Sequence, residues 1–190
     1  MTDAKPYDAH ASADQNENTF TLQGRDPYTP GLINLWAILM SGDLPMLESA
    51  YDKIRSALNS EINLGNTFGN VQMTRGKHTQ AYHFAMMIRE GQDSPKISNE
   101  YDAHSTAEKG EQTFTLQSND PYFADLIELW AALMTGNKNE TEMRFREISK
   151  TFQQQSQTSH AFGKKQRKRG KIVMAFQLSK EIQNSLLSTV

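Results

Sequence analysis

The stretch Thr19-Phe20-Thr21-Leu22-Gln23 occurs again 94 residues later as Thr113-Phe114-Thr115-Leu116-Gln117. At this one offset, and without a gap, 22 of the 36 positions between residues 7 and 42 are identical to their partners. Identity of this extent at a fixed offset indicates a tandem duplication. We therefore expect two homologous repeat units, residues 1–94 and 95–190, related by a pseudo-twofold axis.

Each unit carries one strand pattern followed by helical patterns. Phe20 and Leu22 alternate with polar residues, which predicts a short strand that pairs either inside its own unit or with its twin. Apolar residues then recur at helical spacing, and they are Leu32, Leu35, Trp36 and Leu39 in one unit and Leu126, Leu129, Trp130 and Leu133 in the other. Two more helices follow, and the last runs from about residue 77 to 89 or 171 to 187. The expected fold is mainly α (α+β), with a short strand and about three helices per unit.

The ends of these helices are marked by residues with special backbone preferences. Asp26-Pro27 and Asp120-Pro121 read as helix starts, although Pro30 shifts the expected start in the first unit to Thr29-Pro30. Gly42 and its twin, Gly136, close the first helix of each unit. The Asn-, Gln- and Ser-rich stretches 59 to 66 and 153 to 159 are interpreted as loops or frayed helix ends.

Composition limits the class of protein. The chain has 190 residues, no cysteine and a net charge of −2, so disulfides and thiolate metal sites are excluded. It shows neither a signal peptide nor an apolar run of about 18 residues, and we expect a cytoplasmic protein without a membrane segment. Units of this size are marginally stable alone, which predicts that the two units pack on each other, and a further homo-oligomer is possible.

Two polar features occur in both units and are candidates for a ligand site. Arg75-Gly76-Lys77, with its twin Arg169-Gly170-Lys171, places two cations around a glycine before a helix, a plausible grip for a phosphate. Tyr28 and Tyr122 lie near a helix N-terminus and could stack on a ligand. If so, the sites should come as a pair. The alternatives are a solvated turn that caps the third helix and tyrosines that cover the end of the strand.

A basic segment distinguishes the second unit from the first. Residues 164 to 171 contain six cations in eight positions, including Lys164, Lys165, Arg167 and Lys168. Such a run is typical of a nucleic-acid or other polyanion contact. No aromatic residue is interleaved to stack bases, so a flexible loop with weak electrostatic affinity is the alternative.

The sequence contains no strong catalytic motif. Tyr7-Asp8-Ala9-His10 and Tyr101-Asp102-Ala103-His104 pair a carboxylate with an imidazole, but too few ligands are present for a metal site, and a structural arm is the favoured interpretation. Trp36 and Trp130 are expected in the core. We therefore expect no enzyme, no metal and no cofactor.

The pattern Phe20-x-Leu22-x-x-x-Asp26-Pro27, followed by Leu32-Ile33-x-Leu35-Trp36-Ala37, resembles one found in short uncharacterised proteins of phages and prophages. The resemblance implies a mobile-element origin, and host-cell cytoplasm as the location, but no activity. The function expected is a non-enzymatic binding protein that captures a small anionic, nucleotide-like ligand or a host protein, as a counter-defence factor does. The alternative is a nucleic-acid-binding accessory protein that uses residues 164 to 171.

Overall fold

The computed structural model describes residues 19–91 and 111–188 of the chain. The first described range contains β1 (Thr19–Gln23), α2 (Thr29–Ser41), α3 (Leu44–Asn63), α4 (Thr67–Thr74) and α5 (Lys77–Arg89). The second contains β2 (Thr113–Gln117), α7 (Phe123–Thr135), α8 (Lys138–Gln157), α9 (Ala161–Lys168) and α10 (Lys171–Ser188). The expected mainly α (α+β) class is confirmed. The Tyr-Asp-Ala-His segments lie outside the described residues.

Within the described ranges, each half has four helices instead of the expected three. The short helices α4 and α9 follow a left-handed residue, Asn66 (φ 54°) or His160 (φ 52°), and neither has a clear apolar stripe in the sequence. Helices α3 and α8 also run to Asn63 and Gln157, so most of the two expected loops are helical. Helix α2 begins at Thr29 with proline in its first turn, as expected from Pro30.

The two strands form an antiparallel sheet that joins the halves. Thr21 lies opposite Thr115, its own repeat partner, and the two hydroxyl groups are 2.9 Å apart. Phe20 pairs with Leu116, and Leu22 pairs with Phe114. Since Phe114 is the repeat partner of Phe20 and Leu116 that of Leu22, the pairing is symmetric about Thr21 and Thr115. The strand therefore pairs with its twin, and the sheet provides backbone hydrogen bonds across the centre of the molecule.

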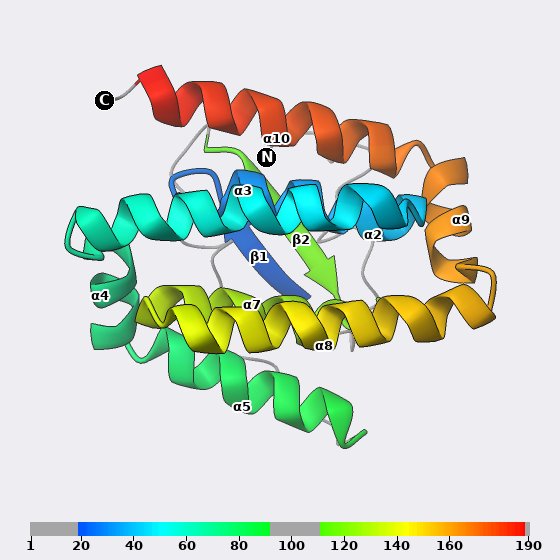
Figure 1. Ribbon diagram of the computed structural model, residues 1–190, viewed down its shortest axis with the longest axis horizontal. Helices are drawn as coiled ribbons and strands as arrows, with labels where there is room; N and C mark the ends of the chain where they lie inside the picture. Colours follow the sequence, from blue (N-terminus) through cyan, green and yellow to red (C-terminus); the bar gives the residue numbers. More distant parts are fainter. Residues whose placement is uncertain (1–18, 92–110, 189–190) are drawn as a thin grey trace, which may run out of the picture.

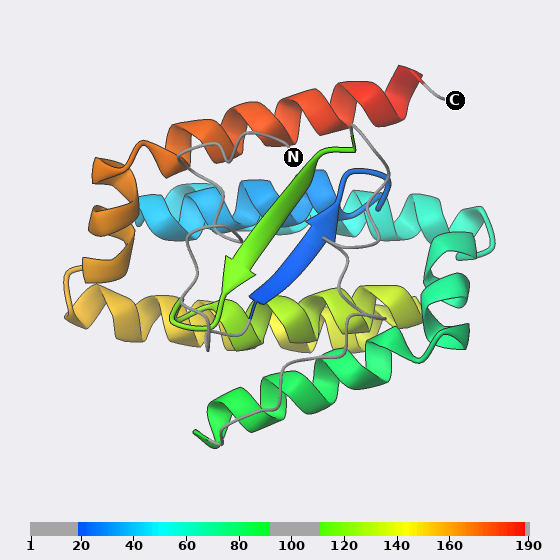
Figure 2. The same ribbon diagram turned by 180° about the vertical axis from the view of Figure 1, so that it is seen from behind.

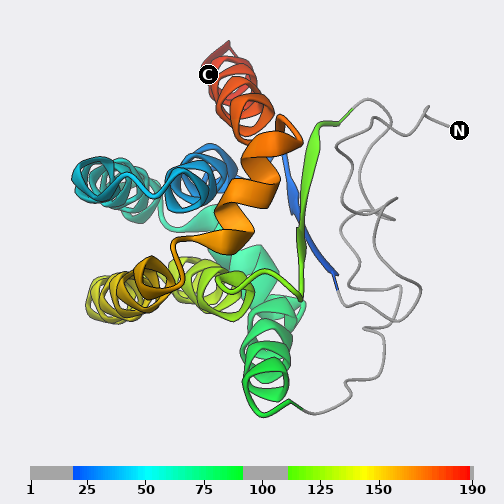
Figure 3. The same cartoon turned by 90° about the vertical axis from the view of Figure 1, so that its right-hand side faces the viewer.

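The helices are arranged in layers behind this sheet (Figures 1 and 2). Figure 3 shows β1 and β2 on one side, α2 and α7 next to them, and α3 and α8 on the far side. Helices α5 and α10 lie at the flanks, and α4 and α9 close the two ends (Figure 1). The side chains of α2 and α7 are almost entirely buried, including Trp36 (1% exposed) and Trp130 (2% exposed), as expected.

The last two helices of each half pack against the other half. Helices α4 and α5 contact α7, whereas α9 and α10 contact α2. The approach is closest at Gly69, where a Cβ atom would lie 2.2 Å from the Met134 carbonyl oxygen, and at Gly163, at the same distance from the Met40 carbonyl oxygen. Helix α4 therefore needs a glycine where it meets the C-terminal end of α7, and α9 needs one where it meets the C-terminal end of α2. The two halves are intertwined, because the last two helices of each half pack on the first helix of the other half.

This close approach leads to a stability prediction. Gly69→Ala and Gly163→Ala should each lower the free energy of unfolding by about 1–3 kcal/mol, because the added methyl group has to displace backbone atoms. Urea unfolding followed by circular dichroism measures the change. Val71→Ala on the exposed side of α4 is the control and should change it by less than about 0.5 kcal/mol. Equal stability of the glycine variants and the control would contradict the close packing.

Candidate functional site

The lysines of the two Arg-Gly-Lys turns are core residues. Lys77 and Lys171 are only 7% and 6% exposed. The Lys77 ammonium lies 5.6 Å from the ring centre of Phe20 and 5.2 Å from that of Trp130, and Lys171 lies 5.0 Å from that of Trp36. These distances are in the range of cation–π contacts. Since a phosphate could not reach either ammonium without disrupting the core, the geometry does not support the expected phosphate grip.

The rest of this tripeptide forms a turn between helices. Arg75 and Arg169 are exposed C-cap residues of α4 and α9. Gly76 and Gly170 have φ angles of 74° and 72°, a left-handed conformation that favours glycine. The geometry fits a turn that starts the following helix, which was the alternative interpretation.

A pair of buried carboxylates fastens the halves to each other. The Trp130 Nε1–H donates to Asp26 at 2.8 Å, and the Trp36 Nε1–H donates to Asp120 at 2.7 Å. Burial raises the pKa of both carboxyl groups to about 6, although the indole donors, a backbone N–H group of the neighbouring tyrosine and the nearby lysine all act to lower it. The two Trp–Asp hydrogen bonds, which we call the lock, connect the halves across the centre of the molecule.

The raised pKa values predict an unusual dependence of stability on pH. Between about pH 4 and pH 6 the folded state binds more protons at Asp26 and Asp120 than the unfolded state does, so stability should fall as the pH rises through this window. The loss should be on the order of 2–3 kcal/mol per carboxyl group and complete near pH 7. Thermal unfolding from pH 4 to 7 tests this, and the double variant Asp26→Asn with Asp120→Asn should show a much flatter profile. A wild-type stability that rises steadily to pH 7 would contradict it.

A groove lies between α2, α3 and α10. Its volume is about 780 Å³, within the range of about 300–1,000 Å³ that is usual for small-molecule sites. Helix α10 is held against α2 here by the Ser179 hydroxyl, which donates to the Pro30 carbonyl oxygen at 2.7 Å. The lining residues are Pro27, Tyr28, Pro30, Gly31, Asn34, Lys53, Ile54, Ser56, Ala57, Ser60, Phe176, Gln177, Ser179, Lys180 and Gln183.

Two buried polar atoms of this lining have no hydrogen-bond partner. They are the hydroxyl group of Tyr28, which is 1% exposed, and the amide nitrogen of Asn34, which is 9% exposed. Burial raises the pKa of Tyr28, and the charges of Glu61 and Asp26 raise it further, so this hydroxyl remains protonated. A buried donor without a partner costs about 1–3 kcal/mol. A ligand acceptor in the groove would recover this cost.

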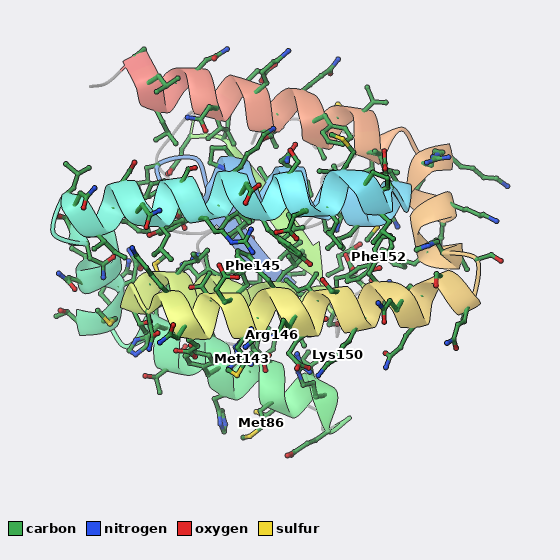
Figure 4. The ribbon with its side chains drawn as sticks, viewed as in Figure 1. Met86, Met143, Phe145, Arg146, Lys150 and Phe152 are labelled. Atoms are coloured by element: carbon green, nitrogen blue, oxygen red, sulfur yellow. The ribbon has the colours of Figure 1, made fainter. Side chains whose placement is uncertain are left out.

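The equivalent helices of the other half, α5, α7 and α8, are joined by an ion-pair network. Arg89 of α5 donates to Asp125 at 2.5 Å and to Glu128 at 2.8 Å, both on α7. Helix α8 adds Arg144, 2.9 Å from Glu128, and Thr151, whose hydroxyl donates to Asp125 at 2.6 Å. Met143 and Lys150 lie on the side of α8 that faces α5, whereas Phe145 faces α3 (Figure 4). Tyr122 is 2% exposed, nearly as buried as Tyr28, and its hydroxyl also lacks a hydrogen-bond partner.

The basic segment is a helix and a turn. Residues 164 to 168 belong to α9, and Lys164, Lys165 and Lys168 are exposed. Arg167 is also exposed, and it donates a hydrogen bond to the Ser41 carbonyl oxygen at 3.1 Å. In the equivalent helix α4, Thr67–Thr74, there is no charged residue. The positive charge at this end of the molecule therefore has no counterpart at the other end.

Neither residues 19–91 nor residues 111–188 contain a cluster of three or more His, Cys, Asp or Glu residues placed to hold a metal ion. None of the described helices has both the length and the apolar character required to cross a bilayer. No protein-family model matches the chain, and the searches of curated proteins and of solved structures returned no match.

Proposed function

We propose that this is a non-enzymatic binding protein that captures one small anionic, nucleotide-like molecule in the groove between α2, α3 and α10. The observation that carries the proposal is the pair of buried, unpartnered donors, Tyr28 and Asn34, in the lining of an open groove. Unsatisfied buried donors are rare in folded proteins, and they are explained when a ligand supplies the acceptor.

The rest of the lining favours an anion with a flat apolar part. Lys53 and Lys180 are exposed residues of the lining, on α3 and α10, and neither forms an ion pair with a described residue. Phe176, 37% exposed, offers a ring on which a planar group can stack. Ser56 and Ser60 add hydroxyl groups on α3. This combination of cations, an aromatic face and fixed donors suits a nucleotide better than a wholly apolar ligand.

The internal repeat supplies a matched pair of variants for the test. Tyr28→Phe and Tyr122→Phe each remove one buried hydroxyl group without a partner, so both should leave stability unchanged or raise it slightly. Only Tyr28→Phe should weaken binding, by about two- to tenfold, the usual range for one hydrogen bond. Calorimetric titration with mononucleotides, cyclic dinucleotides and sugar phosphates measures the binding, and thermal unfolding measures the stability.

The two variants distinguish binding in the groove from binding elsewhere on the protein. Binding that weakens in Tyr28→Phe and not in Tyr122→Phe supports the groove as the site. Equal weakening in both variants, or none, would reject it. Absence of binding by the whole panel would turn the search to a host protein as the captured partner. In a phage or prophage, sequestering a signalling nucleotide of the host would act as counter-defence.

The second candidate function is a nucleic-acid accessory role, and the exposed lysines of α9 favour it. Lys164 and Lys168 are four residues apart on α9, and Lys165 is four residues before the C-cap residue Arg169. Like charges at this spacing destabilise a helix by about 0.2–0.5 kcal/mol. Residues 151 to 180 also contain no acidic residue that could neutralise them. A phosphate backbone is the polyanion that such a surface fits.

Three serine substitutions test this second candidate. Replacing Lys164, Lys165 and Lys168 should lower affinity for a double-stranded DNA fragment and reduce the slope of log K against log salt by about 2–3, because each lost phosphate contact accounts for about 0.9. The control replaces Lys138, Arg146 and Lys150, exposed residues of α8 (Figure 4 shows the last two), and removes the same charge. Fluorescence anisotropy measures both. Equal losses in the two variants would show that only net charge matters.

A further inference from the structure

The two halves place different residues at the same positions of an equivalent three-helix arrangement. The groove is framed by α2, α3 and α10, and the ion-pair network by α7, α8 and α5. At an offset of 94, Asn34 corresponds to Glu128, Gly31 to Asp125, and Gln183 to Arg89. In one half these positions are neutral, and in the other they carry three of the charges that make up the network.

The network connects α5, α7 and α8 through charged side chains. Arg89 spans from α5 to two carboxylates of α7, and the Asp125 and Glu128 side chains are only 6% and 11% exposed. Burial raises the pKa of both carboxyl groups, and Arg89 opposes the rise in each case. Both carboxylates are already paired with arginines, so an entering anion would have to displace one of these ion pairs to reach a cation. The position of Glu128 is occupied in the open groove by the amide of Asn34, which is able to donate a hydrogen bond to an acceptor on a ligand.

We infer that the residues at positions 34 and 183 decide whether a groove of this protein holds a ligand, and that the chain has one ligand site and one sealed copy of it. This inference rests on the proposed function. It adds the number of sites and the residues that determine them. The sequence led us to expect a pair of sites, whereas this geometry predicts one per chain.

Exchanging residues between the two halves tests the inference. The closing variant combines Asn34→Glu with Gln183→Arg, which rebuilds the pair formed by Glu128 and Arg89 at 2.8 Å. The opening variant combines Arg89→Gln, Asp125→Gly and Glu128→Asn. The probe is anilinonaphthalene sulfonate, an aromatic anion that fits the chemistry of the open groove, and its fluorescence gives the number of molecules bound per chain.

We expect one probe molecule per chain in the wild type, none in the closing variant and two in the opening variant. The control, Gln153→Glu with Gln157→Arg, adds the same two charges to exposed positions of α8 and should keep one molecule. Circular dichroism establishes that each variant is folded. If the opening variant does not fold, the closing variant and its control still decide the matter.

Three results would overturn the inference, and they differ in what they say of the proposed function. One bound molecule that persists in a folded closing variant would place the site elsewhere. Two molecules bound to the wild type would show that the network does not seal its half. No probe bound to the wild type would reject both the inference and the groove as a binding site. Probe numbers as expected, without binding of any nucleotide or sugar phosphate, would support the single site and reject only the proposed ligand class.

Discussion

Residues 1–94 expressed alone should associate into an intertwined homodimer or aggregate, and they should not form a stable folded monomer. In the full chain α4 and α5 pack on α7 of the other half, and β1 has β2 as its partner. An isolated half would expose both surfaces. A second copy can cover them because Asp26, Trp36 and Lys77, which contact the other half, are identical to their repeat partners.

Light scattering after gel filtration measures the mass, and circular dichroism measures the helix content over a range of concentrations. Folding should depend on concentration, as it does for obligate dimers. Coexpressed residues 1–94 and 95–190 should form a one-to-one complex with the helix content of the full chain. A helical, monomeric half that unfolds cooperatively at all concentrations would show that the exchange of helices is not needed for stability.

Trp36→Ala should cause a large loss of stability. The side chain is 1% exposed, so its removal leaves a large cavity, which typically costs about 3–5 kcal/mol. It also takes away the indole donor of the buried Asp120 carboxyl group. A loss of this size is a large part of the total stability of a small domain, which is about 5–15 kcal/mol.

The repeat provides the comparison for this substitution. Trp130→Ala removes the donor to Asp26 in the same way and should destabilise the protein by a similar amount. Val173→Ala, at a residue that is 62% exposed, should change stability by less than about 0.5 kcal/mol. Chemical denaturation monitored by circular dichroism gives the three values. A small effect at either tryptophan would contradict its role in the lock.

The sequence predicted the parts of the fold that depend on local pattern. The strand, the buried tryptophans and the start of α2 at Thr29 follow from alternation, helical spacing and proline. The packing of α4 on α7, and of α9 on α2, could not be predicted from the sequence. It depends on distant contacts such as that of Gly69 with the Met134 carbonyl group, 65 residues away. Gly69 and Gly163 occupy the same position of the repeat, but a shared glycine does not identify the group that it contacts.

The candidate site is harder to predict from the sequence, because identity between the repeats does not distinguish a shared core from a shared ligand site. Lys77 and Tyr28 are identical to their partners, Lys171 and Tyr122, yet all four side chains are buried. Identity here marks residues that both halves need for the shared core. The positions that differ between the repeats are the ones that indicate the site. Between Leu32 and Met40 only positions 34 and 38 differ from their partners, and Asn34 lines the groove.

The most direct test of the account is a calorimetric titration of the wild type and of the closing variant, Asn34→Glu with Gln183→Arg. Each is titrated with the same panel of mononucleotides, cyclic dinucleotides and sugar phosphates. We predict that at least one of these anions binds the wild type at one molecule per chain and does not bind the closing variant. Two molecules per chain in the wild type, equal binding in the two proteins, or no binding of the whole panel to the wild type would contradict the account.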